Sequence, residues 1–254
     1  MSGFTGWGVV VTGAGSGMGA VAARRFAQAG ARVVVSDIEE AAAQAVARGL
    51  PAAIGMRCDV SMPSDCAALV GAAERFLGAP VDVFLANAGL SYAGDFLQAD
   101  PGELRRVIDV NVSGSIFSAQ AALRSLVKSP RASLIFTGSV SGLMGRAQRS
   151  VYTASKHALG GLVKSLALEF GPRGVRVNAI APGPTDTPFL RAHLAKVNDD
   201  VGTAVAGLVG GLPLGRLVQP EDFAEAALFL ASPAAGAITG HTLALDCGSA
   251  AGRM

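Results

Sequence analysis

The 254-residue sequence is rich in hydrophobic residues, at 50%, and poor in charged ones, at 16%. This length suits one large α/β domain over residues 1–254 with a full hydrophobic core, and the composition excludes a disordered chain. The 21 Lys and Arg residues nearly balance the 19 Asp and Glu residues, and the net charge of +2 comes without a dense basic block, which argues against a nucleic-acid partner.

Short β-branched runs alternate along the chain with Ala-rich segments whose apolar residues recur every three or four positions. The runs predict strands at residues 9–11, 32–37, 53–59, 81–87, 133–139, 175–182 and 241–246. Such alternation is typical of β-α-β units with right-handed crossovers. We therefore predict an α/β fold, with a single Rossmann-like, doubly wound parallel sheet of about seven strands and helices on both faces.

Start signals mark several of the helices between these strands. The predicted N-terminal caps are Ser64 or Asp65, Asp100 and Gln219. The last of these helices is expected to end near residues 232–233. The longest insertion, residues 185–218, follows a strand end, which is where open α/β sheets bind ligands, and is predicted to cover the substrate.

A glycine-rich loop follows the first predicted strand. It has the pattern Gly-x-x-x-Gly-x-Gly, with Met18 where the strict dinucleotide fingerprint has its third glycine. Glycines let backbone N–H groups at a helix start approach a pyrophosphate, whereas a tight turn without a ligand is the alternative interpretation. The residues predicted to bind a dinucleotide are Gly13, Gly15, Ser16, Gly17, Met18 and Gly19.

Asp37 ends the second predicted strand, 24 residues after Gly13. A carboxylate at this position can accept hydrogen bonds from the adenosine ribose and would repel a 2′-phosphate. Its neighbours Ser36, Ile38 and Glu39 bring no positive charge. The sequence therefore predicts NAD rather than NADP as the cofactor, with a solvated strand-end aspartate as the alternative.

Tyr152 and Lys156 stand at i and i+4, a spacing that places Cβ atoms about 5–6 Å apart on one face of a helix. A tyrosine with the usual pKa of about 10 is a weak base at neutral pH, and a nearby cation stabilises its phenolate. We predict that Lys156 lowers the pKa of Tyr152 toward neutrality, so that Tyr152 acts as a general acid and base.

Together with this pair, several motifs resemble those of the short-chain dehydrogenase/reductase family in order and approximate spacing. They are the glycine loop, Asn87-Ala88-Gly89, Asn111, Ser139, Tyr152 with Lys156, and Pro182-Gly183. The resemblance covers essentially the whole chain, including the tail segments at residues 213–216 and 220–222.

The resemblance implies a catalytic role for four residues. Tyr152 would exchange a proton with the substrate oxygen, and Lys156 would assist it and hold the nicotinamide ribose. Ser139 would bind the substrate oxygen, and Asn111 would help to hold a water that links Lys156 to solvent. The further implied cofactor contacts are Ile38, Asp59, Val60, Asn87, Ala88, Gly89, Pro182, Gly183, Thr185 and Thr187.

The substrate pocket is predicted from residues that follow the strand ending at Ser139, the Asn87-Ala88-Gly89 turn or the loop at residues 182–187. Its expected residues are Ser141, Met144, Gln148 and Phe189, with Tyr92, Leu143 and Leu190 as further neighbours. This mostly apolar set suits a medium-sized alcohol or ketone. Arg146 and Arg149, just before Tyr152, could bind a carboxylate or sulfonate, although solvated charge is the commoner role of such arginines.

Three functions are compatible with these residues. An NAD-dependent alcohol dehydrogenase or ketone reductase is favoured. An NADPH-dependent carbonyl reductase is disfavoured by Asp37, and a catalytically silent dinucleotide-binding protein is disfavoured by the complete Asn-Ser-Tyr-Lys set. Family members are commonly homotetramers, and the resemblance implies pairing through helices at about residues 104–128 and 151–170.

Cysteine, histidine and charge patterns complete the expectations. The three cysteines include no Cys-x-x-Cys pair, and the three histidines are dispersed, so we predict no disulfide framework, no metal site and a cytoplasmic location. The uncharged stretches 2–23 and 226–245 contain glycines, and the second also contains proline. Neither is predicted to span a membrane.

Overall fold

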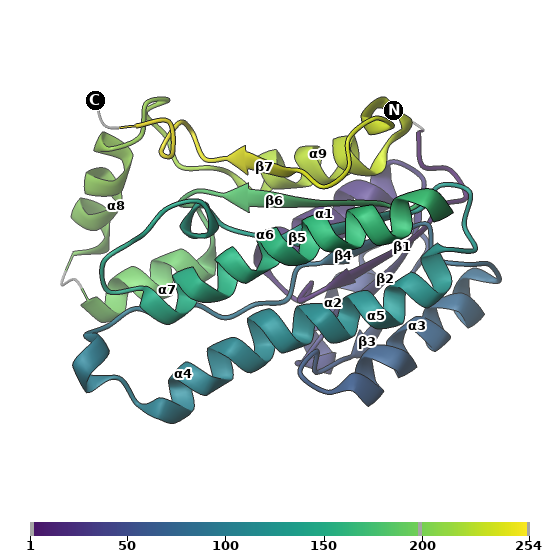
Figure 1. Cartoon of the computed structure of the whole chain (residues 1–254), viewed down its shortest axis with the longest axis horizontal. Coiled ribbons are helices and arrows are strands. Elements are labelled where there is room, and N and C mark those ends of the chain that lie inside the picture. Colours follow the sequence, from purple (N-terminus) through teal and green to yellow (C-terminus); the bar gives the residue numbers. More distant parts are fainter. Residues whose placement is uncertain (1–2, 198–199, 253–254) are drawn as a thin grey trace.

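The computed structural model describes residues 3–197 and 200–252, and its centre is a sheet of parallel strands in the order β3-β2-β1-β4-β5-β6-β7 (Figure 1). The strands are β1 (Gly8–Thr12), β2 (Arg32–Asp37), β3 (Ala53–Arg57), β4 (Val83–Ala86), β5 (Ser133–Thr137), β6 (Arg176–Pro182) and β7 (Thr242–Leu245). All six pairings between neighbours are parallel. The predicted doubly wound sheet is thereby confirmed.

Helices connect consecutive strands. They are α1 (Gly17–Gln28), α2 (Glu40–Arg48), α3 (Pro63–Leu77), α4 (Pro101–Ile108), α5 (Gly114–Leu126), α6 (Ser150–Phe170), α7 (Pro188–Val197), α8 (Val201–Gly210) and α9 (Pro220–Ala231). A wide π-helical turn, Asp109–Ser113, joins α4 to α5. Within the described ranges, no helix combines the length and the apolar character that a membrane span needs.

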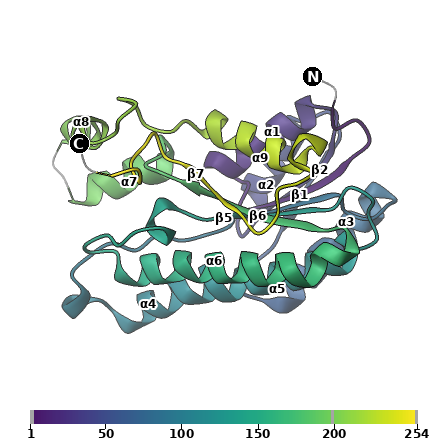
Figure 2. The same ribbon diagram turned by 45° about the horizontal axis from the view of Figure 1, so that its top comes forward.

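Two hydrophobic layers cover the sheet because successive side chains of a strand point to opposite faces. Val9 and Val11 of β1 pack with Phe26 of α1 and Phe223 of α9 on one face. Val10 packs on the other face with side chains of α3, α5 and α6. Figure 2 shows this division, with α1, α2 and α9 on one side of the strands and α5 and α6 on the other.

The predicted caps are confirmed at two of three helices. The Asp100 carboxylate accepts a hydrogen bond from Glu103 N at 3.0 Å at the start of α4, and Gln219 is the N-cap of α9, which ends at Ala231. The prediction for α3 is wrong: this helix begins at Pro63, whose fixed φ suits a first helical position. Asp65 consequently lies within the first turn.

Four predicted strands end earlier than expected; the one predicted over residues 241–246 stops one residue early, at Leu245. The strands predicted over residues 53–59, 81–87 and 133–139 stop at Arg57, Ala86 and Thr137. The residues beyond these ends leave the sheet at its carboxyl edge and line a cavity there.

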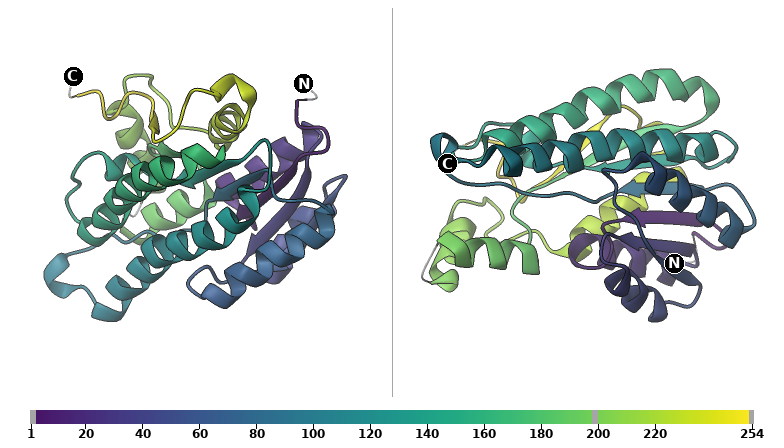
Figure 3. Two further views of the ribbon diagram at one scale, coloured as in Figure 1. Left: turned by 45° about the vertical axis from the view of Figure 1, so that its right-hand side comes forward. Right: turned by 90° about the horizontal axis from the view of Figure 1, so that it is seen from below.

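The insertion at residues 185–218 contains α7 and α8. It packs on a small apolar cluster of its own, which includes Leu212, Leu217, Val218 and Cys247. Figure 3 shows this segment extending beyond the carboxyl ends of the strands, away from the sheet. Because Leu190, Leu194 and Leu208 also line the cavity at that edge, the insertion forms part of its wall.

Candidate active site

A cavity of about 450 Å³, called the main cavity below, opens at the carboxyl ends of the strands. The strand order reverses between β1 and β4, and ligands of open parallel sheets bind in the crevice at such a point. Its walls come from the segments that follow successive strands, beginning with Gly13, Asp37, Cys58, Asn87, Gly138 and Pro182.

The glycine loop between β1 and α1 packs closely against the segment after β4. A Cβ atom at Gly13, where φ is +60°, would lie 2.7 Å from the Cα atom of Ala88, and one at Gly19 would lie 2.5 Å from Gly13 O. A side chain at either position would push the loop away from the sheet.

Gly17 differs from these two glycines because it faces open space. It starts α1 with a φ of +56°, and the nearest atom to a Cβ there would be Thr187 Cγ2, at 3.9 Å. The N-cap Ser16 makes no side-chain capping bond, so its hydroxyl does not occupy the first N–H groups of α1. Loop and helix start thus form a cradle that fits the pyrophosphate of a dinucleotide.

Asn87 ties three strands together beneath this loop. Its Nδ2 atom donates to Thr12 O at 3.0 Å and to Gly13 O at 2.9 Å, and its Oδ1 atom accepts from Thr137 Oγ1 at 3.1 Å. Thr12 Oγ1 in turn accepts from Asn87 N and Ala88 N. Asn87, Ala88 and Gly89 all line the main cavity.

Asp37 lines the main cavity at the end of β2. Its Oδ2 atom accepts from Gly15 N at 2.9 Å, and its Oδ1 atom accepts from Glu39 N at 3.1 Å. Gly15 is the one predicted member of the glycine loop that does not line the cavity; it holds the carboxylate instead. The other residues predicted at this end, Ile38, Asp59 and Val60, line the cavity as well.

Ser139, Tyr152 and Lys156 meet in the wall of the same cavity. Ser139 follows β5 and leads into a short 3-10 helix, Val140–Gly142, while the other two lie on α6. A Cβ atom at Gly142 would lie 2.7 Å from Lys156 O. The glycine therefore lets the turn close on α6, which places Ser139 next to Tyr152.

The environment of Tyr152 shifts its pKa in opposing directions. Burial raises the pKa, because it disfavours the charged phenolate, and this is the largest effect. A hydrogen bond with Ser139 and the charges of Arg149 and Arg146 lower it. Lys156, which was expected to lower the pKa, is not among these groups; its ammonium lies 5.8 Å from the Tyr152 ring centroid.

Lys156 is buried, with an exposed fraction of 6%, and its Nζ atom donates to Thr137 O at 2.8 Å. Desolvation by burial lowers the pKa of Lys156 from its ordinary value of 10.5 to about 8. A buried ammonium held by a neutral carbonyl is unfavourable for stability, which indicates a functional role for this lysine.

Asn111 lies behind the cavity wall, fully buried in the π-helical turn. Its side chain accepts from Leu90 N and donates to Leu90 O, both at 2.8 Å, and donates to Ser155 Oγ at 3.0 Å. Ser155 Oγ donates to Tyr152 O at 2.7 Å. Asn111 therefore links the loop after β4 to α6, whereas its expected role in holding a water stays a prediction.

The loop after β6 forms the wall opposite the glycine loop. Pro182, Gly183, Thr185 and Thr187 line the main cavity. Thr185 Oγ1 donates to Gly183 O at 3.0 Å, and Thr187 Oγ1 accepts from Leu190 N at 3.2 Å.

A second segment holds this loop through Val218. Val218 N donates to Pro184 O at 3.0 Å, and Asp186 N donates to Val218 O at 2.9 Å, so Val218 pairs with both sides of Thr185.

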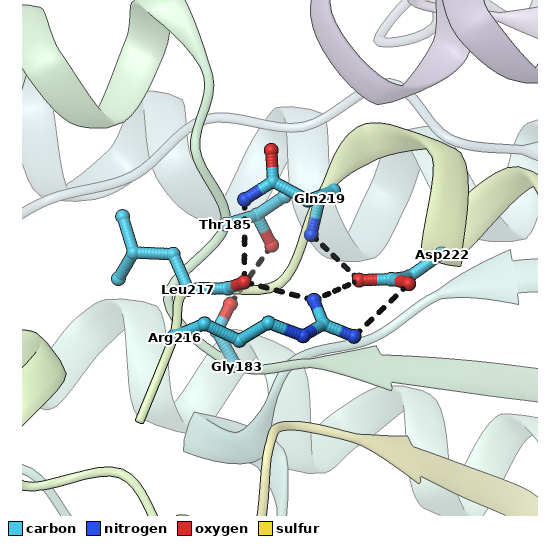
Figure 4. A network of polar contacts seen from close by, with 6 residues as sticks. All are labelled: Gly183, Thr185, Arg216, Leu217, Gln219 and Asp222. Atoms are coloured by element: carbon cyan, nitrogen blue, oxygen red, sulfur yellow. Dashed lines mark hydrogen bonds and ion pairs between the residues drawn. The ribbon is translucent and has the colours of Figure 1, made fainter. Parts of the chain in front are cut away.

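An ion pair next to Val218 fixes that segment in turn. Figure 4 shows the Arg216 guanidinium between the Asp222 carboxylate, at 2.6 Å, and the Leu217 carbonyl oxygen, at 3.1 Å. The same carboxylate accepts from Gln219 N at 2.8 Å. Arg216 and Asp222 therefore brace the loop that carries Thr185.

The predicted substrate residues are only partly brought together. Ser141 lines the main cavity, whereas Met144 and Gln148 do not. Gln148 is exposed and adopts a left-handed φ of +61°, and its carbonyl oxygen accepts from Gly94 N at 2.9 Å. The Phe189 side chain lies outside the part of the structure that is described. Leu190 does line the cavity.

Several lining residues were missed from the sequence. They include Leu90, Ser91, Arg106, Val110, Thr137, Leu194 and Leu208. Apart from Thr137, which ends β5, these residues lie on loops or on helices whose orientation depends on tertiary packing. Ser155 had a usable signal, because it stands between Tyr152 and Lys156 in the motif. In the described part of the chain, no group of three His, Cys, Asp or Glu side chains could hold a metal ion.

Comparison with known proteins gives relatives that match nearly the whole chain. The profile of a family described as enoyl-(acyl carrier protein) reductase matches residues 13–250. The chain is 38% identical to cis-4-hydroxycyclohexanecarboxylate dehydrogenase of Sinomonas cyclohexanicum over 244 residues, which cover 94% of each protein. It is 39% identical to galactitol 2-dehydrogenase (L-tagatose-forming) of Cereibacter sphaeroides over 245 residues, which cover 94% of the chain and 92% of the relative.

A third relative and a solved structure extend this result. Meso-2,3-butanediol dehydrogenase of Serratia marcescens is 36% identical over 245 residues, which cover 96% of the chain and 94% of the relative. The crystal structure of 3-ketoacyl-(acyl-carrier-protein) reductase from Brucella melitensis complexed with NADH superposes with a TM-score of 0.88 at 32% identity, covering 97% of this chain and 99% of that one.

Proposed function

Because the chain belongs to the short-chain dehydrogenase/reductase family, we propose that it transfers a hydride between a secondary alcohol, or its ketone, and NAD(H), with Tyr152 as general acid and base. One observation carries the proposal: a single cavity is lined by the glycine loop, Asp37, and the Ser139, Tyr152 and Lys156 side chains. The relatives named for a hydroxycyclohexane acid, galactitol and butanediol support an alcohol as substrate.

The residues for the cofactor fit a nicotinamide dinucleotide. The start of α1 at Gly17 would hold the pyrophosphate, Asp37 the adenosine ribose, and Thr185 with Thr187 the nicotinamide end. When bound, the nicotinamide supplies the acceptor or donor of the hydride. The preference for NAD rests on Asp37, since a carboxylate at the ribose repels a 2′-phosphate and Ser36, Ile38 and Glu39 do not neutralise it.

Proton transfer would take place between Tyr152 Oη and the substrate oxygen. In oxidation, the Tyr152 phenolate removes the hydroxyl proton, and in reduction the phenol returns it, while the Ser139 hydroxyl hydrogen-bonds the same oxygen. Burial disfavours the phenolate, whereas the hydrogen bond with Ser139 and the positive charges of Arg149 and Arg146 stabilise it. Lys156, whose pKa is about 8, adds a positive charge at neutral pH and would bind the nicotinamide ribose.

A substrate screen tests this function. Secondary alcohols, hydroxy acids and polyols are offered with NAD⁺ or NADP⁺, and reduced cofactor is followed by absorbance. We expect oxidation of at least one class, with a higher kcat/KM for NAD⁺ than for NADP⁺. Failure to oxidise any of them, in the presence of measured NADH binding, would argue for a catalytically silent protein, and preference for NADP⁺ would contradict the assignment to Asp37.

The assembly and location form a separate part of the proposal. We infer a homotetramer that pairs through α5 and α6, supported by the exposed apolar side chains of Ile116 (44%) and Leu168 (82%) on these helices. A cytoplasmic location is supported by the three free cysteines. Light scattering at several protein concentrations measures the assembly; a monomer throughout would contradict it.

A further inference from the structure

The charged residues that line the main cavity are unevenly distributed. Among the described lining residues the carboxylates are Asp37 and Asp59, which follow β2 and β3 at the proposed adenosine end. The basic lining residues are Arg106, Arg146, Arg149 and Lys156. Arg146 and Arg149 belong to the segment that leads into α6, the helix of Tyr152, and their charges lower the pKa of Tyr152.

The two guanidinium groups also act on each other. Arg149 is the N-cap residue of α6, and its Nη1 atom donates to Ser91 Oγ at 3.1 Å. Burial is the largest effect on the pKa of Arg149 and lowers it, the charge of Tyr152 raises it, and the charge of Arg146 lowers it. Two like charges in a partly buried wall destabilise each other unless an anion lies between or beside them.

Arg146 is the member of the pair that is available to a ligand. Within residues 3–197 and 200–252, none of the ion pairs includes its guanidinium. It is half-buried and lines the same cavity as Tyr152. Guanidinium forks match the geometry of carboxylates and sulfonates.

We propose that Arg146, next to Arg149, binds an anionic group of the substrate, so that the preferred substrates are secondary alcohols or ketones that carry a carboxylate or sulfonate. The inference rests on the function proposed above and names its substrate class. A different role for the pair is only to stabilise the Tyr152 phenolate. That role would affect charged and neutral substrates equally, which makes the two roles separable.

Matched pairs of charged and neutral substrates distinguish binding of a substrate anion from stabilisation of the Tyr152 phenolate. We use 3-hydroxybutanoate with 3-hydroxybutanamide, and 3-hydroxycyclohexanecarboxylate with its amide, and measure the ratio of kcat/KM for acid over amide. Since a hydrogen bond to a charged group is worth roughly a factor of 10 to 100 in binding, we expect the wild-type ratio to be of that order. Arg146→Gln should reduce the ratio to about one, mainly by raising the KM of the acid.

Two further variants make the measurement specific. Arg146→Lys keeps the charge without the fork and should retain part of the preference for the acid. Arg48→Gln removes an exposed charge of α2 outside the cavity and should leave the ratio unchanged. Any change of the Tyr152 pKa affects both members of a substrate pair and cancels in the ratio.

The outcomes are distinct for the two proposals. Three results would overturn the anionic substrate class but leave the dehydrogenase function standing. They are an acid-over-amide ratio near one in the wild type, a ratio that persists in Arg146→Gln, and oxidation of neutral alcohols while all four probes are inert. Absence of NAD⁺-dependent oxidation for every alcohol tested overturns both.

Discussion

Replacing Lys156 by Met is expected to abolish activity and, at the same time, to stabilise the fold. Lys156 is buried with its ammonium on the Thr137 carbonyl oxygen, 2.8 Å away. Methionine has a similar volume and no charge, so it removes the desolvation penalty without leaving a large cavity. The variant thus separates the contribution of this lysine to chemistry from its contribution to stability.

The magnitude follows from the pKa of Lys156. Its fall from 10.5 to about 8 corresponds to a penalty of about 3 kcal/mol for holding the charged form in the folded protein at pH 7. Loss of the bond to Thr137 O offsets about 1 kcal/mol of this. The remaining gain of about 2 kcal/mol predicts a Tm higher by roughly 4–8 °C in a chain of this size.

The difference in stability between Lys156→Met and the wild type is expected to depend on pH. Between pH 8 and 10.5 the unfolded chain binds more protons at Lys156 than the folded protein does, so the stability of the wild type rises with pH in this window. The advantage of Lys156→Met should therefore be full below pH 8 and vanish toward pH 10.5.

The assay is calorimetry across this pH range together with NAD⁺-dependent turnover. Lys164→Met, an exposed position two turns further along α6, is the matched control and should change neither Tm nor activity appreciably. A Tm of Lys156→Met that is equal to or below that of the wild type at pH 7, or an advantage that does not depend on pH, would refute the reasoning.

Two other substitutions test the ends of the cofactor site. Asp37→Asn keeps an acceptor for Gly15 N but removes the negative charge. Since a charged contact is worth about a factor of ten, this variant should raise the ratio of kcat/KM for NADP⁺ over NAD⁺ by roughly tenfold or more. An unchanged ratio in steady-state kinetics would show that Asp37 does not select the nucleotide. Arg216→Met breaks the ion pair that braces the loop carrying Thr185. Because a partly exposed ion pair contributes little energy, the KM for NAD⁺ should rise by less than about tenfold while kcat changes little. A large loss of kcat with an unchanged KM would speak against a positioning role.

The sheet could be predicted from the sequence because buried parallel strands read as continuous β-branched runs. Residues 9–11 illustrate this, since Val9 and Val11 face one layer and Val10 the other. The strand ends could not be predicted equally well. Asp59 and Ser139 continue an extended pattern locally, but their segments leave the sheet at the cavity, and tertiary contacts decide that point.

That Tyr152 and Lys156 lie close together could be predicted from their i, i+4 spacing, which a helix converts directly into proximity. The direction in which the pKa of Tyr152 is shifted could not be predicted, because it depends on burial, and the burying elements are far apart in the sequence. The positions of Met144 and Gln148 could not be predicted either, because they depend on tertiary contacts. A left-handed turn at Gln148 and its backbone bond to Gly94 set the path of this loop, and neither residue reaches the cavity.

The central claim is that Tyr152 transfers the proton in an NAD-dependent oxidation. Its most direct test compares wild type, Tyr152→Phe and Tyr92→Phe in alcohol oxidation and in NADH binding measured by fluorescence. Tyr92 is the other tyrosine of the chain and, contrary to the expectation from the sequence, does not line the main cavity. General acid–base catalysis predicts that Tyr152→Phe lowers kcat by about 10²–10⁴-fold, whereas the Kd for NADH changes little and Tyr92→Phe behaves as the wild type. Turnover near the wild-type rate in Tyr152→Phe, or loss of NADH binding in it, would contradict the account.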